Sequence, residues 1–164
     1  MQSKPKRGES IRDVKEPVHS TLAAVFRTTL ASALPWLWAW LPPLGIMATI
    51  FWFSSQPTLP SVPGYWLDAL LKKASHVAIF TLLFLLFVRA WRSGRTSRQT
   101  VSIAILSTAA YAISDELHQA FVPGRHCNWY DVAIDLSGAL IIGLLLRGGL
   151  SLPFLRGGDV DLPE

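Results

Sequence analysis

Charged residues and cysteines are both scarce in this sequence. Lysine, arginine, aspartate and glutamate make up 16% of the 164 residues, and hydrophobic residues make up 51%. A soluble domain usually carries about a quarter charged residues, so this chain has too little polar surface for water. The single cysteine, Cys127, excludes an internal disulfide framework. No His-Glu-x-x-His or comparable metal-ligand spacing occurs. The length allows one domain of ordinary size.

Long apolar runs occupy most of the chain. A membrane-spanning helix needs about 20 apolar residues, because each residue rises about 1.5 Å across about 30 Å of hydrocarbon. Four runs approach this length, at about residues 34–53, 74–91, 99–118 and 129–148. The first is uncharged and apolar on every side, which disfavours a soluble bundle with buried helices. The sequence therefore predicts an all-α, polytopic membrane protein with a four-helix transmembrane bundle.

The basic residues predict how this bundle is oriented. Twelve of the fifteen lysines and arginines precede the first run, or lie at or beyond the end of the second run or of the fourth. The positive-inside rule then places both termini in the cytoplasm. The predicted domains are a basic, mobile tail (1–33), a membrane domain (34–148) and a second cytoplasmic tail (149–164). A cleavable signal peptide is disfavoured because a long polar segment precedes the first run. The formal net charge of +4 permits a nucleic-acid partner, but the basic residues flank apolar runs, so none is predicted.

Polar residues gather where the four runs reach the outer membrane face. Charge in hydrocarbon costs a few kcal/mol, so these groups are expected to face the bundle interior and to find partners. Asp115 and His118 are three residues apart and share one helix face, and Asp131 and Asp135 are four apart and share another. The predicted functional cluster consists of Ser55, Gln56, His76, Asp115, Glu116, His118, Gln119, Arg125, Asp131 and Asp135.

Individual members of this cluster also have plainer interpretations. Asp135, with Arg125, His76, His118 or Lys73 as its partner, can be a structural ion pair. Glu116 is rotated about 100° from the Asp115 face and is expected to meet solvent. Two further expectations concern packing. The aromatic stretch 80–87 is interpreted as lipid-facing, and the small residues 137–139 and 143 are expected to allow close helix approach.

Four motifs in these runs resemble the VanZ-like family of small bacterial integral membrane proteins. They are FWFSSQP (51–57), KKASHVAIF (72–80), SDELHQAFVPGR (114–125) and DVAIDLSGALIIG (131–143). The resemblance covers about residues 44–146 and leaves the segment before Leu34 outside. Carried over residue by residue, the characteristic positions of the family are Ser55, Gln56, His76, Asp115, Glu116, Gln119, Phe121, Arg125, Asp131, Asp135 and Gly138. The resemblance implies a cell-envelope protein of the bacterial inner membrane. The founding member is associated with low-level resistance to the glycopeptide teicoplanin, a role not assumed here.

Three functions fit these residues. The first is a site for an anionic, lipid-linked envelope precursor, with His76 and His118 as acid and base and with Arg125 and Lys73 holding phosphate. The second is a structural or accessory protein in which the cluster only fixes helix packing. The third is a divalent-metal site of the two histidines with Asp115 and Asp135. No cofactor is predicted, membrane lipids are expected partners, and a transporter is disfavoured. Catalysis and oligomeric state stay open.

Overall fold

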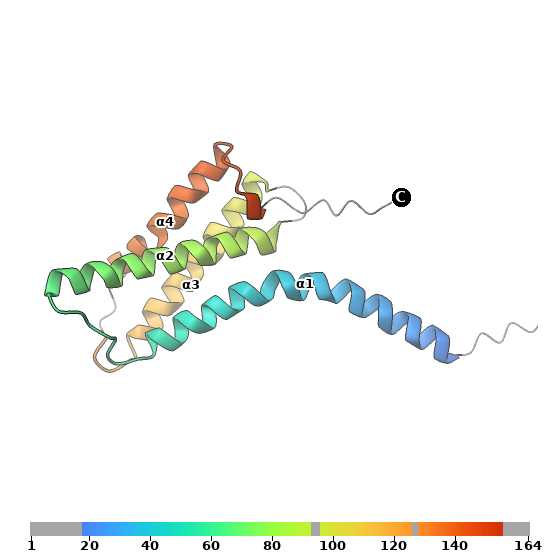
Figure 1. Cartoon of the computed structure of the whole chain (residues 1–164), viewed down its shortest axis with the longest axis horizontal. Helices are drawn as coiled ribbons and strands as arrows, with labels where there is room; N and C mark the ends of the chain where they lie inside the picture. Colours follow the sequence, from blue (N-terminus) through green and yellow to red (C-terminus); the bar gives the residue numbers. More distant parts are fainter. Residues whose placement is uncertain (1–17, 93–95, 126–127, 156–164) are drawn as a thin grey trace, which may run out of the picture. The chain divides into compact units, whose positions relative to one another are not determined.

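The computed structural model describes residues 18–92, 96–125 and 128–155, with side chains from residue 34 onward except that of residue 154. Within these ranges the chain forms four α-helices, one 3-10 turn (Pro153–Leu155) and no strand (Figure 1). The helices are α1 (Val18–Ser54), α2 (Tyr65–Trp91), α3 (Arg98–Gln119) and α4 (Trp129–Arg147). The chain divides into two compact units, residues 1–35 and 36–164. The second unit contains the rest of α1 and the other three helices.

Two helices begin earlier than the apolar runs predict. The helix α1 begins at Val18, within the segment that was expected to be a tail, although the apolar stretch long enough to span a membrane is Leu34–Ser54. The helix α2 begins at Tyr65, so the predicted start at residue 74 is wrong. The reason is that the helix accommodates both lysines before that point. Lys72 pairs with Asp68 one turn earlier, and Lys73 pairs with Asp131 of α4.

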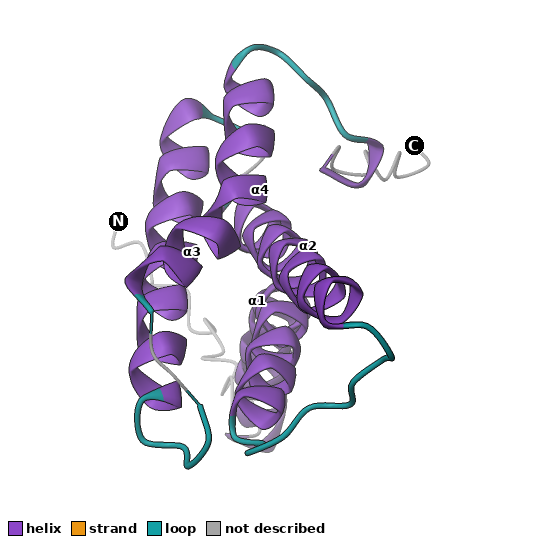
Figure 2. Ribbon diagram, turned by 90° about the vertical axis from the view of Figure 1, so that its left-hand side faces the viewer, coloured by secondary structure: helices purple, strands orange, loops and turns teal. Residues whose placement is uncertain are grey.

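The contacts between α2 and α4 fix the relative directions of the helices. The Nζ of Lys73 lies 2.8 Å from Oδ1 of Asp131. One turn further along α2, Nδ1 of His76 lies 3.3 Å from Oδ1 of Asp135, which is one turn further along α4. The two helices therefore run in the same direction. The helix α3 packs against both and runs in the opposite direction, from the end of α2 to the start of α4 (Figure 2).

In the described part of the chain, three helical stretches are long and apolar enough to cross a membrane: Leu34–Ser54, Tyr65–Trp91 and Trp129–Arg147. The helix α3, with 22 residues, is about 33 Å long and also has the required length. Its composition is more polar because its inward face carries Thr108 and Asp115, whereas Leu106 and Leu117 are exposed on the other side. Since α2 and α4 are parallel, α3 has to cross wherever they do. The fold is the predicted all-α membrane bundle.

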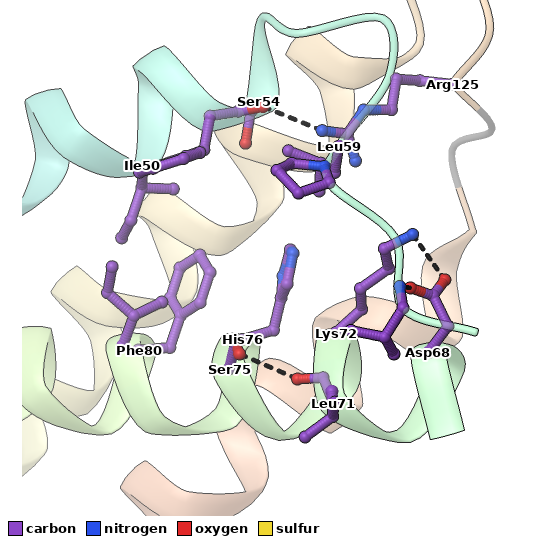
Figure 3. A pocket seen from close by; sticks show the side chains of 14 residues that line it. Ile50, Ser54, Leu59, Asp68, Leu71, Lys72, Ser75, His76, Phe80 and Arg125 are labelled. Atoms are coloured by element: carbon purple, nitrogen blue, oxygen red, sulfur yellow. Dashed lines mark hydrogen bonds and ion pairs between the residues drawn. The ribbon is translucent and has the colours of Figure 1, made fainter. Parts of the chain in front are cut away.

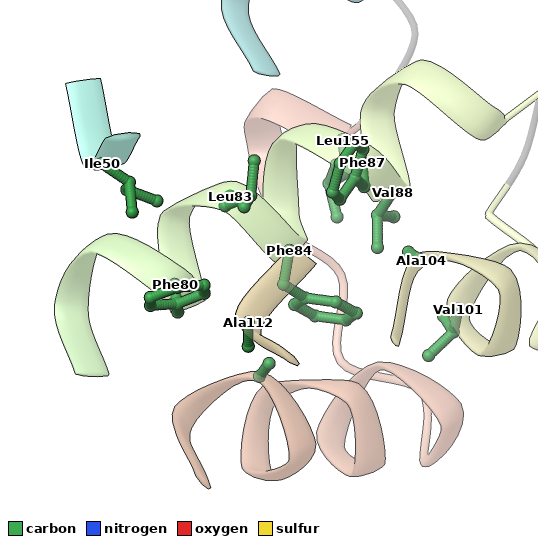
Figure 4. Close-up of a cluster of buried hydrophobic side chains, with 11 residues drawn as sticks. Ile50, Phe80, Leu83, Phe84, Phe87, Val88, Val101, Ala104, Ala112 and Leu155 are labelled. Carbon is green, nitrogen blue, oxygen red and sulfur yellow. The ribbon is translucent and has the colours of Figure 1, made fainter. Parts of the chain in front are cut away.

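Three phenylalanines of α2 belong to the hydrophobic core (Figure 4). Phe80 and Phe84 are fully buried and Phe87 is 5% exposed, so the expectation that this stretch faces lipid is wrong. The stretch is buried because α3 and α4 both pack on it. As predicted, small residues of α4 allow this approach: a Cβ on Gly138 would lie 2.0 Å from Oγ1 of Thr81.

The chain after α4 turns back onto the bundle. Leu155, in the 3-10 turn, is 6% exposed and belongs to the core. Arg92, just after α2, donates a hydrogen bond to the Leu155 carbonyl. Part of the segment expected to be a tail is therefore packed.

Candidate functional site

The end of α1 is joined to α3 by a buried hydrogen-bond network. Oγ of Ser54 donates to Oδ2 of Asp115 at 2.9 Å, and Nε2 of Gln119 donates to the same oxygen at 2.9 Å. The amide nitrogen of Gln119 also lies 3.3 Å from Oγ of Ser54. All three residues are at most 5% exposed. The second carboxylate oxygen of Asp115, Oδ1, has no hydrogen-bond partner among the described residues.

His118 contacts the same end of α1 through Ser55. Oγ of Ser55 donates to the Phe51 carbonyl at 2.7 Å, so its only proton is engaged. His118 Nε2, 3.0 Å from the same Oγ, is therefore the donor in that contact, and the imidazole ring packs on Phe51 with centroids 4.5 Å apart. His118 cannot act as a base toward Ser55 in this arrangement. Asp115 and His118 both contact α1, as their shared helix face predicts.

Arg125 caps the C-terminal end of α1. Its Nε donates to the Gln56 carbonyl at 3.0 Å and its Nη2 to the Phe53 carbonyl at 2.8 Å. These carbonyls lie at the C-terminal end of the helix, where its dipole attracts a cation, and the Phe53 carbonyl also accepts a hydrogen bond from the Gln56 N–H at 3.2 Å. Within the described ranges, no carboxylate forms an ion pair with Arg125. The Gln56 side chain bonds the Trp52 carbonyl at 3.1 Å.

The two aspartates of α4 have different environments. Asp135 is 2% exposed and faces His76, whose side chain is 31% exposed. Asp131 is partly exposed and pairs with Lys73, which also lies 5.4 Å from the Tyr130 ring centroid. Of the four partners predicted for Asp135, the structure selects the histidine of α2.

Glu116 does not meet solvent, and that expectation is wrong. The residue is 5% exposed, and its Oε2 accepts a hydrogen bond from the backbone N–H of Asn128 at 3.0 Å. Asn128 immediately precedes α4, so the start of α4 lies close to this side of α3. Glu116 thereby helps to position the start of α4. Phe121, in the loop between α3 and α4, is 80% exposed.

Two cavities adjoin these groups. An apolar cavity of about 370 Å³ lies between the end of α1, the following loop and α2, and its apolar lining includes Ile50, Leu59 and Ile79 (Figure 3). A second cavity of about 310 Å³, lined mostly by polar and charged residues, lies between α2, α4 and the end of α3. The two cavities share three lining residues: Lys72, His76 and Arg125.

The predicted residues divide into two groups by their relation to the cavities. His76, Glu116, Gln119, Arg125, Asp131 and Asp135 line one cavity or both, whereas Ser55, Gln56, Asp115 and His118 line neither. The predicted cluster left out Ser54 and Lys72, which lie on the same outer side as the cluster and directly beside Ser55 and Lys73. Cys127 lies outside the described residues.

The described residues contain no group of three or more histidine, cysteine, aspartate and glutamate side chains that could hold a metal ion. The metal set considered from the sequence, His76 and His118 with Asp115 and Asp135, is therefore not assembled. His76 is paired with Asp135 of α4, whereas His118 is paired with Ser55 of α1.

A family comparison matches most of the chain. The model of the VanZ/LLP1 family matches residues 23–151, so the match begins before Leu34, within the segment that the motifs left outside. Neither the curated proteins nor the solved structures gave a match. The family match covers well over half of the chain and includes all four helices at least in part. The chain therefore belongs to the VanZ-like family, as a helical membrane protein.

Proposed function

We propose that the protein binds an anionic amphiphile, a lipid-linked component of the cell envelope, where its two cavities adjoin. The hydrocarbon chain of the ligand occupies the apolar cavity, and its head group lies against Lys72, His76 and Arg125. The observation that carries this proposal is that these three side chains line both cavities. Ligand sites typically combine an apolar lining with a few placed polar groups, and cavities of this size fall in the usual range.

Arg125 is the principal anchor for the head group. Its Nε and Nη2 are engaged by backbone carbonyls, and its Nη1 makes no hydrogen bond within the described part of the chain. A guanidinium group suits phosphate oxygens because it is planar, always charged and rich in donors. Lys72 contributes less, because its ammonium group lies 2.6 Å from the Asp68 carboxylate and is largely neutralised by it.

The proposed location is the bacterial cytoplasmic membrane, with both termini in the cytoplasm and the cavities toward the extracytoplasmic face. The positive-inside distribution of lysine and arginine supports this orientation. At the end of the bundle remote from the cavities lie Arg89, Arg92, Arg98 and Arg147. An envelope precursor in the outer leaflet would then have direct access to the site.

A structural or accessory role is the second candidate function, and the bonding of Arg125 favours it. The same two hydrogen bonds that place the guanidinium group also fix the end of α1. The Ser54, Asp115 and Gln119 network does so as well. In such a protein the polar cluster would hold the helices together and no ligand would change the stability.

Thermal unfolding of the full chain in detergent distinguishes the two candidates. The probe is farnesyl pyrophosphate, with farnesol and inorganic pyrophosphate as the tail-only and head-only controls. Binding at a hundred times Kd contributes about 2.7 kcal/mol, so we expect the midpoint to rise by about 5 °C or more with the amphiphile. Each control should give a smaller shift, because it fills one cavity only.

Variants locate the binding. Arg125→Gln should remove most of the shift relative to its own midpoint, whereas Arg147→Gln, at the far end of α4, should keep it. Ile79→Trp fills the apolar cavity and should abolish the tail-dependent part, and Leu82→Trp on the exposed side of α2 should not. A midpoint indifferent to all three probes contradicts ligand binding and favours the structural role.

A further inference from the structure

His76 is oriented toward the cavities by two contacts. Its Nδ1 faces the buried Asp135 carboxylate at 3.3 Å, and its ring stacks on Phe80 with centroids 6.4 Å apart. The ring points from α2 into the apolar cavity, on the side where Arg125 and Lys72 reach in (Figure 3). A carboxylate that accepts the Nδ1 proton of an imidazole leaves the Nε2 lone pair for another partner. This pair therefore places a base where the proposed head group lies.

We propose that the protein hydrolyses the pyrophosphate bond of a lipid pyrophosphate, with His76 as the base that accepts a proton from the attacking water. This inference rests on the proposed function, because the amphiphile must first bind between the two cavities. His76 is the catalytic residue, Asp135 is a positioning residue that acts through it, and Arg125 with Lys72 binds the phosphate oxygens. General bases of this kind accelerate reactions by about 10²–10⁴-fold.

The step balances without a further reactant. A lone pair of the water oxygen forms a bond to the terminal phosphorus while one water proton moves to Nε2 of His76. The bond from that phosphorus to the bridging oxygen breaks, and its electron pair stays on the bridging oxygen of the lipid monophosphate. Inorganic phosphate leaves, and His76 releases its proton to solvent. Charge that develops on the phosphate oxygens is stabilised by the guanidinium group of Arg125.

The neighbouring hydroxyl groups favour water as the nucleophile. The Ser54 hydroxyl is buried and donates to Asp115, the Ser55 hydroxyl donates to the Phe51 carbonyl, and the Ser75 hydroxyl donates to the Leu71 carbonyl at 2.8 Å. None of the three is oriented to donate its proton to His76. These three hydroxyls are engaged, so none of the three serines is available as a nucleophile in this arrangement. His76 therefore takes its proton from a water molecule, which is the nucleophile.

The leaving group selects a pyrophosphate over a simple phosphate ester. The lipid monophosphate departs as a stable anion and needs no proton, whereas an alkoxide leaving group would need an acid. Of the described histidines, His76 alone lines the two cavities, and it already serves as the base. A single base therefore suffices for a pyrophosphate and not for an alkyl phosphate.

The test measures phosphate release from farnesyl pyrophosphate by the full chain in detergent, with the thermal shift recorded in the same samples. Wild-type protein should release one phosphate per farnesyl monophosphate formed and should leave farnesyl monophosphate intact. His76→Gln should reduce release at least about a hundredfold while keeping most of the thermal shift, because Arg125 is the principal anchor of the head group. Asp135→Asn should lower kcat with KM little changed, and Arg98→Gln, at the other end of the bundle, should match wild type.

The outcomes separate the two proposals. Binding of farnesyl pyrophosphate without phosphate release overturns the hydrolysis and leaves the binding function intact. Absence of both binding and release overturns both. Release that survives His76→Gln, or that is lost in His118→Gln instead, overturns the assignment of the base. If Asp135→Asn does not fold, the comparison of His76→Gln with wild type decides alone. The His76→Gln protein, purified in parallel, also measures the background phosphatase activity of the preparation.

Discussion

At the scale of single residues, Gly138 lies where α4 packs directly on α2. A Cβ at this position would lie 2.0 Å from Oγ1 of Thr81, and that oxygen is held by a 2.6 Å hydrogen bond to the Val77 carbonyl. Gly138→Ala should therefore lower the free energy of unfolding by about 1–3 kcal/mol, the usual cost of overpacking. Denaturation of the purified protein in detergent measures the change. Gly45→Ala is the control, because a Cβ added there would have no described atom within 4 Å outside the neighbouring backbone of its own helix.

The double variant tests the steric cause. Removing the hydroxyl with Thr81→Ala should restore part of the stability that Gly138→Ala loses. The restoration is partial, because Cγ1 of Val77 would still lie 3.1 Å from the new Cβ. Gly45→Ala should be stabilising by about 0.5–1 kcal/mol, since alanine is the better helix residue. Equal effects of the two glycine substitutions would contradict close packing at Gly138.

The sequence indicates which polar residues lie at one end of the bundle, but it does not indicate which residues they bond. Helical spacing places Asp115 with His118 on one face, and the structure confirms this because both contact α1. Spacing says nothing about what covers a face. The expectation that Glu116 meets solvent is wrong because Asn128, the residue before α4, donates a hydrogen bond to it. Helical spacing within α3 does not contain this contact. The choice of His76 for Asp135 depends on the parallel packing of α2 and α4, which no local pattern contains.

At the scale of elements, α1 is attached to the bundle through a few side chains. The Tyr111 hydroxyl of α3 donates to the Met47 carbonyl of α1 at 2.5 Å. Two helical turns earlier in α1, the Trp40 ring contacts the Trp91 ring of α2, with centroids 4.9 Å apart. Tyr111→Phe should cost about 0.5–1.5 kcal/mol, the net value of a typical hydrogen bond. It should also speed hydrogen exchange in α1 more than in α2 or α4.

Tyr65→Phe provides the matched control for this prediction. Tyr65 is 80% exposed at the start of α2, and its hydroxyl makes no hydrogen bond among the described residues. The control should leave the midpoint and the exchange rates unchanged. A uniform increase of exchange in all four helices after Tyr111→Phe would mean that α1 unfolds together with the bundle.

Most helix boundaries lie within one residue of the ends of the apolar runs. The helix α3 begins at Arg98, after Ser97 accepts a hydrogen bond from the Thr100 N–H, and α4 begins at Trp129 as the apolar run predicts. The predicted start of α2 is too late because two consecutive lysines, Lys72 and Lys73, are typical of the end of a membrane span. In the fold Lys72 is paired with Asp68, one turn earlier in the same helix, and Lys73 is paired with Asp131 of α4, a tertiary contact that the local sequence does not show.

At the scale of the whole molecule, the parallel direction of α2 and α4 makes a sharp topological prediction. If α3 crosses the membrane, Ser97 and Gly124 lie on opposite sides. Alkaline phosphatase needs disulfides and is active only outside the cytoplasm. Fusions after Pro63 and Gly124 should therefore be active, and fusions after Ser97 and Leu152 inactive. Enzyme activity normalised to the amount of each fusion measures this.

The four fusions answer two separate questions. Equal activity after Ser97 and Gly124 would mean that α3 does not cross, against the parallel α2 and α4 contacts. If the fusions after Ser97 and Leu152 are active and those after Pro63 and Gly124 are inactive, the four-helix topology holds but the cavities face the cytoplasm. In that case Arg125 would face ligands of the inner leaflet, and an outer-leaflet envelope precursor would have no access to it. The expected pattern instead puts the cavities on the face where such precursors are used, as the arginine-rich opposite end predicts.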